Sequence, residues 1–247
     1  MENKRFARTA MLLGSKGIEN LKQSCVMIVG VGAVGGYCLE ALARAGVGKF
    51  ILIDFDVFEE SNINRQILAT SDSLGQKKVD IAKERVLSIN PNALVETKDM
   101  FLNTDNINDL SFNHVDMVID AIDSLNPKCA LIQKLIDISV PFISSMGAAL
   151  KIDTSKIKYG NLSNSKNCAL AKFVRKRLRK RGVDISKIKC VWSDEQVILP
   201  DSALAVDEEN ANEVGRQRNT MGSLPTITAI FGLTIANQII LDLANKK

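Results

Sequence analysis

The stretch Val26-Met-Ile-Val-Gly-Val-Gly-Ala-Val-Gly35 decides the fold of this chain. Its first four residues are apolar, which predicts a strand that is buried on both faces of a parallel sheet. After the glycine-rich turn, Tyr37 to Arg44 has the apolar spacing of a helix. This order is typical of nucleotide-binding folds, because a backbone without Cβ atoms can approach phosphate oxygens at a helix N-terminus. We predict nucleotide contacts at Gly30, Gly32, Ala33 and Gly35; the alternative is a tight turn with a purely structural role.

The rest of the first half of the chain alternates between apolar runs and amphipathic segments. Predicted strands cover 50–53, 115–119 and 141–145, and predicted helices cover 75–89 and 124–138. This alternation predicts an α/β protein with a Rossmann-like, doubly wound, mostly parallel sheet. Ligands of such sheets gather outside the carboxyl ends of the strands.

Beyond Gly147 the elements become shorter. We predict an antiparallel extension with strands at 150–153, 156–159 and 189–192 around a basic helix at 169–180. Residues 193–223 are acidic, rich in turn-forming residues and without periodicity, which predicts a mobile crossover loop.

Composition restricts the class of protein. The chain has 247 residues, of which 46% are hydrophobic and 24% charged, and a net charge of +4; these values suit one soluble α/β domain. Five cysteines without paired spacing predict free thiols in a reducing, cytoplasmic compartment. Residues 1–8 are polar and no apolar segment follows, so we expect no secretory signal. The apolar segment 224–244 contains Pro225, Asn237 and Asp242, which favours a buried helix over a membrane span.

Charged residues follow the predicted strands where a polyphosphate would lie. Asp54 ends the second strand, in position to accept hydrogen bonds from ribose hydroxyls, and Asp56 follows it. Arg65 and Lys78 supply cations for the phosphates, and Asp123 supplies a carboxylate for Mg²⁺. Each has an alternative role as a solvated surface charge or, for Asp123, as a helix N-cap. Together, at consecutive strand ends, they favour attack on ATP over dinucleotide binding.

These motifs resemble those of the ubiquitin-activating-enzyme-like adenylyltransferases, the group that includes MoeB, ThiF and HesA. The segment from Arg5 to Lys78 carries most of the resemblance, and it includes an R-[YF]-x-R start and an N-x-x-R-Q signature. The matching positions are Arg8, Asp54, Asn62, Arg65, Gln66, Lys78 and Asp123. The resemblance implies Mg-ATP, an acyl-adenylate intermediate and a homodimer in which Arg8 enters the site of the neighbouring subunit.

The second half of the chain narrows the resemblance to one branch. MoeB and ThiF relatives usually carry two C-x-x-C pairs for a structural zinc, and this chain has none. Four of its motifs are similar to those of the tRNA threonylcarbamoyladenosine dehydratases: Ser145-Met-Gly147-Ala, Leu170-Ala-Lys172, Cys190-Val-Trp-Ser193 and Gly222-Ser-Leu-Pro-Thr226. Asn167-Cys168 departs from the Asp-Pro of those relatives, which puts the local turn in doubt. We interpret 1–247 as one adenylation domain, with a nucleotide-binding half at 1–147 and a dimer and substrate half at 148–247.

A basic segment at 169–189 fits a tRNA partner. It holds nine Lys or Arg residues and one acidic residue, Asp184, and such charge density attracts a phosphate backbone. We predict RNA contacts at Lys172, Arg175, Arg177, Arg179 and Arg181. The alternative is a solvated helix face above an ordinary apolar stripe of Leu170, Phe173, Val174 and Leu178.

The implied reaction is an ATP-dependent dehydration. The threonyl carboxylate attacks the α-phosphate, and the carbamoyl group of the same nucleoside then closes a ring and expels AMP. Because that nucleophile is tethered, no enzyme thiol is required, so we assign Cys190 a structural role and His114 a place on the surface.

Three other functions remain open on the sequence alone. The first is an adenylyltransferase that activates the C-terminus of a ubiquitin-like or sulfur-carrier protein. The second is an NAD-dependent oxidoreductase, which leaves Arg65 and Lys78 without a role. The third is a non-catalytic nucleotide-binding module. The sequence also leaves open a monovalent cation near the site and sulfur-relay partners from a cysteine desulfurase system.

Overall fold

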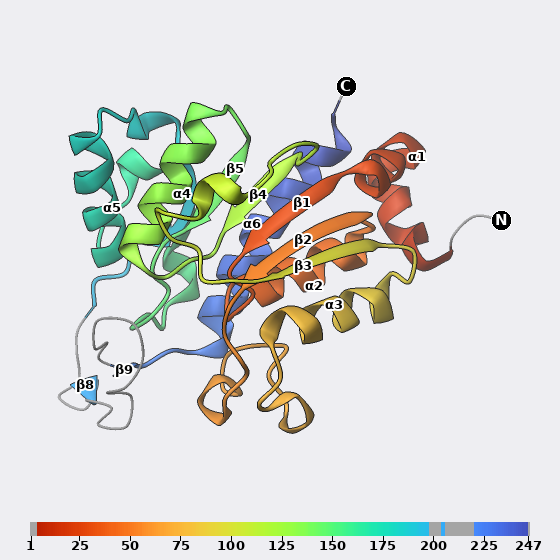
Figure 1. Ribbon diagram of the computed structural model, residues 1–247, viewed down its shortest axis with the longest axis horizontal. Helices are drawn as coiled ribbons and strands as arrows, with labels where there is room; N and C mark the ends of the chain where they lie inside the picture. The colour runs from red at the N-terminus through yellow and green to blue at the C-terminus, as the bar shows by residue number, and fades with distance from the viewer. Residues whose placement is uncertain (1–3, 198–203, 206–219, 247) are drawn as a thin grey trace.

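The structure is a computed structural model that describes residues 4–197, 204–205 and 220–246 (Figure 1). Its centre is a seven-stranded sheet with the order β3-β2-β1-β4-β5-β7-β6. The strands are β1 (Cys25–Val29), β2 (Lys49–Asp54), β3 (Leu94–Asp99), β4 (Met117–Asp120), β5 (Phe142–Ser145), β6 (Ile157–Asn161) and β7 (Lys189–Ser193). All neighbouring pairs are parallel except β6 and β7, which are antiparallel. The predicted α/β class with a mostly parallel sheet and an antiparallel extension is therefore confirmed.

Helices cover both faces of this sheet (Figure 1). They are α1 (Ala7–Gln23), α2 (Gly35–Ala45), α3 (Lys78–Ile89), α4 (Leu125–Asp137), α5 (Ala169–Lys180) and α6 (Pro225–Ala244). Alternate residues of β1 explain the two layers: Val26 and Ile28 belong to the core beneath α2, α3 and α6, whereas Met27 and Val29 belong to the core beneath α4. Two short strands, β8 (Leu204–Ala205) and β9 (Thr220–Met221), pair antiparallel apart from the main sheet.

The strand order places the ligand site. The chain passes from β1 to β2 on one side and later returns to β4 on the other, so β1 and β4 flank a topological switch point. In open parallel sheets, ligands bind in the crevice outside the carboxyl ends of the strands at this point. The glycine-rich turn, which joins β1 to α2, begins there.

Helix α6 is the apolar segment that the sequence placed in the core. By length and composition it is the one helix in the described part of the chain that could cross a membrane, with a mean hydropathy of 1.7. It packs against α1 and α2, and Ile227, Phe231, Ile235 and Ile239 are fully buried. A Cβ atom at Gly232 would lie only 2.5 Å from the carbonyl oxygen of Val34, so α6 and α2 are in close contact.

One further prediction is wrong, one strand was not predicted, and one prediction lies largely outside the described residues. The predicted strand at 150–153 is wrong: Leu150 has a φ of 61°, and the N–H groups of Ile152 and Asp153 donate to the carboxylate of Glu195 instead of to a neighbouring strand. The edge strand β3 was not predicted, because its side chains are mostly half-buried or exposed and lack an apolar run. The predicted crossover loop at 193–223 lies largely outside the described residues.

Candidate nucleotide and substrate site

The glycine-rich turn is shaped by close backbone contacts. Gly30 has a φ of 92°, and a Cβ atom at this position would lie 2.9 Å from the carbonyl oxygen of Ala121. A Cβ atom at Gly35 would lie 1.8 Å from the carbonyl oxygen of Gly30, a separation that no side chain tolerates. Only glycine fits at these two positions, so the turn can wind tightly beside the loop that follows β4.

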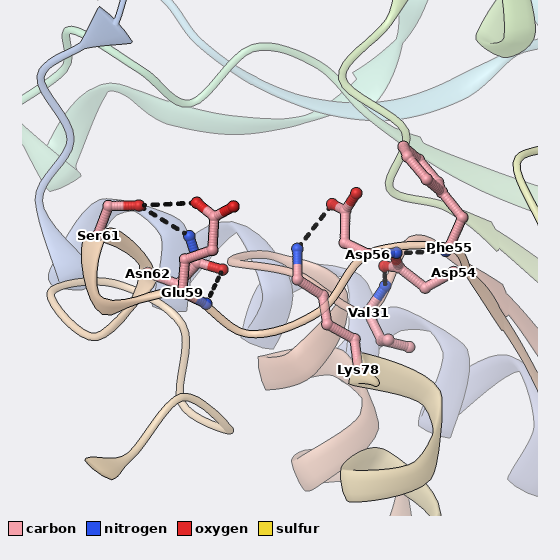
Figure 2. Close-up of polar contacts among 8 residues, drawn as sticks. All are labelled: Val31, Asp54, Phe55, Asp56, Glu59, Ser61, Asn62 and Lys78. Carbon is pink, nitrogen blue, oxygen red and sulfur yellow. Dashed lines mark hydrogen bonds and ion pairs between the residues drawn. The ribbon is translucent and has the colours of Figure 1, made fainter. Parts of the chain in front are cut away.

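Asp54 holds this turn against the end of β2. Its Oδ2 accepts a hydrogen bond of 2.7 Å from the N–H of Val31, and its Oδ1 accepts bonds from the N–H groups of Phe55 and Asp56, as Figure 2 shows. The residue is 8% exposed, and this burial raises the pKa of its carboxyl group, although Lys78 and the backbone donors oppose the shift. Because a carboxylate oxygen has two acceptor sites, Oδ2 can still accept a ribose hydroxyl.

Lys78 projects into the site from the first residue of α3. Its side chain is 7% exposed, and its Nζ lies 2.8 Å from Oδ2 of Asp56 (Figure 2). The Nζ atom also lies 6.0 Å from the centre of the Phe58 ring. Asp56 is more exposed, at 44% of its side chain, so an anionic ligand can approach the ammonium group from the solvent side. The structure thus brings together Asp54, Asp56 and Lys78, three of the residues that the sequence selected.

The N-x-x-R-Q signature forms a compact turn next to the glycines. Asn62 is buried and its Oδ1 accepts a bond from the N–H of Glu59 (Figure 2). Gln66 is also buried, its Oε1 has no hydrogen-bond partner, and this oxygen would lie 3.6 Å from a Cβ atom at Gly32. Arg65 is half-buried, and its Nη1 donates to the carbonyl oxygen of Ser61 at 2.7 Å. The signature therefore lies against the predicted phosphate turn.

Helix α6 and the residue Ser223 just before it also contact this signature. The hydroxyl group of Thr228 lies 3.4 Å from the carbonyl oxygen of Arg65, and Asn64 donates to the carbonyl oxygen of Ser223 at 3.3 Å. Residues far apart in the sequence thus fix the position of the arginine backbone.

Asp123 lies in the loop after β4, beside a buried charge network. Asp120 at the end of β4 accepts bonds from Nζ of Lys128 at 2.7 Å and from Oγ of Ser144 at 2.6 Å. The side chains of Asp120 and Lys128 are fully buried, and Ile122 donates its N–H to the other oxygen of Asp120. The network fixes the loop that carries Asp123, which is exposed.

Lys128 and Ser144 were not selected from the sequence. The sequence did contain a sign of these contacts. Lys128 lies among apolar residues at the start of the predicted helix 124–138, where a solvated side chain is not expected. A lysine is rarely fully buried unless it is paired, so its position in an apolar segment was a clue to a buried acidic partner.

The described residues contain no cluster of three or more His, Cys, Asp or Glu side chains that could enclose a metal ion. Asp123 lies in the loop after β4, at the carboxyl edge of the sheet.

Within one chain, Arg8 lies near the amino ends of the strands, at the end of the sheet opposite the glycine-rich turn. Phe6, two residues earlier, packs on Gly46, which joins α2 to the start of β2. Asp54 is at the other end of that six-residue strand, and five rises of about 3.3 Å give a separation of about 17 Å along the strand. The structure therefore does not bring Arg8 together with Asp54 and Lys78 of the same chain.

The predicted RNA contacts on α5 and at its C-cap, Arg181, differ in their exposure and in their contacts. Lys172, Arg179 and Arg181 are exposed. Arg175 is half-buried and donates to the carbonyl oxygen of Ser165 at 2.8 Å, and Arg181 donates to the carbonyl oxygen of Cys129 at 3.3 Å. Arg177 is half-buried.

Phe173 does not belong to the apolar stripe of α5. Val174 and Leu178 are fully buried, whereas Phe173 is 52% exposed. On a helix surface it neighbours Lys176 and Arg177, three and four residues further along. An aromatic ring thus lies among cations on the outer face.

The cysteines and the histidine lie outside the nucleotide site. Cys190 is fully buried, and burial raises the pKa of its thiol to about 12, so the reactive thiolate is disfavoured. Cys168 is buried at the N-cap of α5, where its sulfur accepts from the N–H of Ala171. His114 is exposed and has a φ of 63°.

Comparisons with known proteins agree with this arrangement. The chain matches the ThiF family over residues 6–247. It is 34% identical to a tRNA threonylcarbamoyladenosine dehydratase of Bacillus subtilis (strain 168), over 97% of this chain and 94% of the relative. It also resembles a crystal structure of E. coli tRNA N6-threonylcarbamoyladenosine dehydratase in complex with ATP, with a TM-score of 0.86, 32% identity and coverage of 97% and 93%.

A second kind of relative matches less of the chain. A molybdopterin-synthase adenylyltransferase of Haemophilus influenzae is 34% identical over 62% of each chain. The glycine turn, Asp54 and the N-x-x-R-Q signature all lie within the residues that match the family. The chain belongs to the ThiF family.

Proposed function

We propose that this protein is an ATP-dependent tRNA threonylcarbamoyladenosine dehydratase that works through an acyl adenylate. The observation that carries the proposal is the extent of the match: relatives with this name align with 92% to 98% of the chain, whereas the adenylyltransferase aligns with 62%. The second half of the chain, with its basic helix, is thus part of what these dehydratases share.

The β1–β4 crevice would hold ATP. The N–H groups at the start of α2 face the phosphates, and the helix N-terminus favours their negative charge. Asp54 would accept a ribose hydroxyl while it continues to hold the N–H of Val31. The ribose and the first phosphate are then fixed on opposite sides of the same short turn.

Lys78 and Arg65 would stabilise the charge that develops on the triphosphate. Lys78 is preorganised by burial and by its ion pair with Asp56, so little reorganisation is needed when a phosphate oxygen replaces or shares that carboxylate. Arg65 would exchange its bond to Ser61 for a phosphate contact. Mg²⁺, when bound with ATP, neutralises triphosphate charge, and Asp123 is the residue that would hold it.

The reaction would proceed in two displacements. The threonyl carboxylate attacks the α-phosphorus, and the bond to pyrophosphate breaks. The carbamoyl group of the same nucleoside then attacks the activated carbonyl carbon, AMP leaves with one of the former carboxylate oxygens, and a ring closes. The second step is intramolecular, so its effective concentration is high without an enzyme nucleophile. The high pKa of Cys190 fits this scheme.

A second copy of the chain would complete each site. Arg8 lies at the far edge of the sheet from its own Asp54, so it would act as a finger in the site of a partner subunit. The exposed side chains of Met11 and Leu12 on the same helix provide apolar surface for such a homodimer.

The basic face of α5 would bind the tRNA. Lys172 and Arg179 are exposed for phosphate contacts, and Phe173 offers a ring on which an unpaired base can stack. The sequence also selected Arg175 and Arg181. Both donate hydrogen bonds to backbone carbonyl oxygens, so they would help to hold this surface in shape. With its cysteines buried and free, the protein would work in the cytoplasm, and this scheme requires neither a monovalent cation nor a sulfur-relay protein.

Incubation with Mg-ATP and tRNA that carries threonylcarbamoyladenosine tests the proposal. We expect a nucleoside that is lighter by one water molecule, together with one AMP and one pyrophosphate for each nucleoside converted. The alternative is an adenylyltransferase for a ubiquitin-like or sulfur-carrier protein, since such enzymes are relatives within the family. Pyrophosphate exchange that depends on a Gly-Gly-tailed protein, with no change in the tRNA nucleoside, would favour that alternative.

A further inference from the structure

The β6–β7 edge of the sheet carries a surface pocket that is separate from the nucleotide site. The pocket has a volume of about 540 Å³ and is bounded by β6, β7 and the loop that leads into α5. Cavities of about 300 to 1,000 Å³ hold small ligands and cofactors, so a nucleotide unit fits this volume. The lining residues include Lys158, Asn164, Lys166, Trp192 and Asp194.

One end of the pocket lies at the carboxyl edge of the sheet. Strand β7 is parallel to β5, so Asp194, which follows the last residue of β7, lies at the carboxyl edge. Two strand spacings, or about 10 Å, separate β7 from β4. A ligand in the pocket and a substrate in the β1–β4 crevice can therefore belong to the same RNA molecule.

One part of the pocket suits an anion. Lys158 and Lys166 are exposed and come from different elements, and in the part of the chain that the structure describes neither ammonium group has an ion-pair or hydrogen-bond partner. Ammonium groups without a partner are ready to bind phosphate oxygens.

Another part suits the edge of a base. Oδ1 of Asp194 accepts from Nε1 of Trp192 at 2.5 Å, which leaves Oδ2 for an amino group of a ligand. Asn164 presents an amide at the same pocket. Carboxylates and amides are the side chains that pair with the amino and ring-nitrogen groups of bases, for example an aspartate with the amino group of cytosine.

The wall of the pocket is fixed before a ligand arrives. Arg175 donates to the carbonyl oxygen of Ser165 at 2.8 Å, and Oγ of Ser165 donates to the carbonyl oxygen of Leu162 at 2.7 Å. Asn167 donates to the carbonyl oxygen of Asp194 at 2.6 Å, which ties the loop to the end of β7. Arg175 is therefore a positioning residue for this wall.

We infer that the pocket binds a nucleoside phosphate, with Lys158 and Lys166 on the phosphate and Asp194 and Asn164 on the base. The inference rests on the proposed function, because the natural source of this ligand in a tRNA-modifying enzyme is an unpaired nucleotide near the modified one. A free mononucleotide has the same chemistry, and the experiment separates the two sources.

Trp192 provides the readout, because it is the only tryptophan of the chain. An unmodified RNA stem-loop with unpaired loop nucleotides should change its fluorescence in a saturable manner. In a K158Q/K166Q double variant we expect about tenfold weaker stem-loop binding, and a salt dependence of log K that is less steep by about 1 for each lost phosphate contact. The affinity for ATP should not change.

A K49Q/K83Q double variant is the matched control. Both lysines are exposed. Lys49 is the first residue of β2, at the amino end of that strand, and Lys83 lies on α3. The loss of charge is the same as in the K158Q/K166Q variant. A response to cytidine monophosphate but not to the stem-loop would assign the pocket to a free nucleotide. The inference is overturned if neither probe changes the fluorescence, or if the two double variants bind the stem-loop equally well. Failure of the proposed function is a separate result: wild-type protein that binds the stem-loop but removes no water from the tRNA nucleoside.

Discussion

At the scale of single residues, the site combines rigid backbone support with one buried cation. Asp54 uses both carboxylate oxygens to hold the turn after β1 and the residues after β2, so it is in place before a ribose arrives. Lys78 is buried, yet its partner Asp56 is open to solvent. The free energy of this pair is therefore modest, and a triphosphate can compete for the ammonium group.

A Lys78→Met substitution tests the role of this cation. Removing a preorganised donor from a charged transition state typically slows catalysis by about 100- to 1,000-fold, and we expect a loss of this size in kcat/KM for ATP. Steady-state kinetics at saturating tRNA measures it. The adjacent Lys77→Met variant is the control, because Lys77 is exposed and pairs with Asp99 at the surface. Equal activity in the two variants would remove Lys78 from the phosphate site.

At the scale of elements, α2 and α3 are joined by a charge network behind the glycine turn. Glu40 of α2 is 8% exposed and accepts bonds from Nε and Nη2 of Arg85 on α3 and from Nε of Arg44. Burial alone would raise the pKa of Glu40, but the hydrogen bonds from Arg85 and Arg44 outweigh it and lower the pKa. The start of α2 and the start of α3 carry the two halves of the predicted phosphate site, so this network fixes their relative position.

An Arg85→Met substitution should reduce the free energy of unfolding by about 1 to 2 kcal/mol near neutral pH, a range that allows for the partial exposure of the guanidinium. Because the folded-state pKa of Glu40 is below its unfolded value, the stabilisation is present above the unfolded pKa and disappears as the pH falls through the folded pKa. The difference between wild type and variant, measured by urea unfolding, should therefore shrink below about pH 4. A Lys83→Met variant on the exposed side of α3 should show no such difference. A destabilisation that does not depend on pH would contradict this account.

The elements also show what the sequence could predict and what it could not. The β1 turn was predictable, because apolar runs and glycines report on local geometry, and the alternation of strands and helices was enough for the fold class. The strand at 150–153 failed because its N–H groups bond to Glu195, more than forty residues away. The Asp120–Lys128–Ser144 network was missed because three elements meet there: Lys128 in an apolar segment was a local clue, but the sequence does not show which residues it contacts. Arg175 and Arg179 lie in the same basic segment, so the sequence does not distinguish them. Only the fold shows that the guanidinium of Arg175 donates to a carbonyl oxygen, whereas Arg179 is exposed.

At the scale of the whole molecule, Arg8, which we propose as a finger for a partner's site, and the nucleotide crevice lie at opposite ends of the strands of one sheet. Arg8 is near the amino end of β2, and Asp54 is at its carboxyl end. A site that needs both would be complete only in an assembly of two chains, so activity should depend on the oligomer.

Mixing two inactive variants tests this arrangement. We expect Arg8→Ala and Lys78→Met proteins each to be inactive as homodimers. After exchange of subunits, half of the dimers are mixed and each has one complete site, so activity should recover to about a quarter of the wild-type value. If Arg8 acted within its own chain, no mixed dimer would contain a complete site and activity would stay absent. Co-purification of the untagged variant with an affinity-tagged copy of the other confirms that subunits have exchanged.

The central claim is that the substrate carboxylate attacks the α-phosphorus of ATP and that AMP later leaves from the activated carbonyl. Transfer of heavy oxygen tests it most directly: tRNA whose threonyl carboxylate carries heavy oxygen in both positions is converted, and the AMP is analysed by mass spectrometry. The account predicts one heavy oxygen atom in each AMP and one in the cyclic nucleoside. AMP without the label, or a labelled phosphate together with ADP, would contradict it.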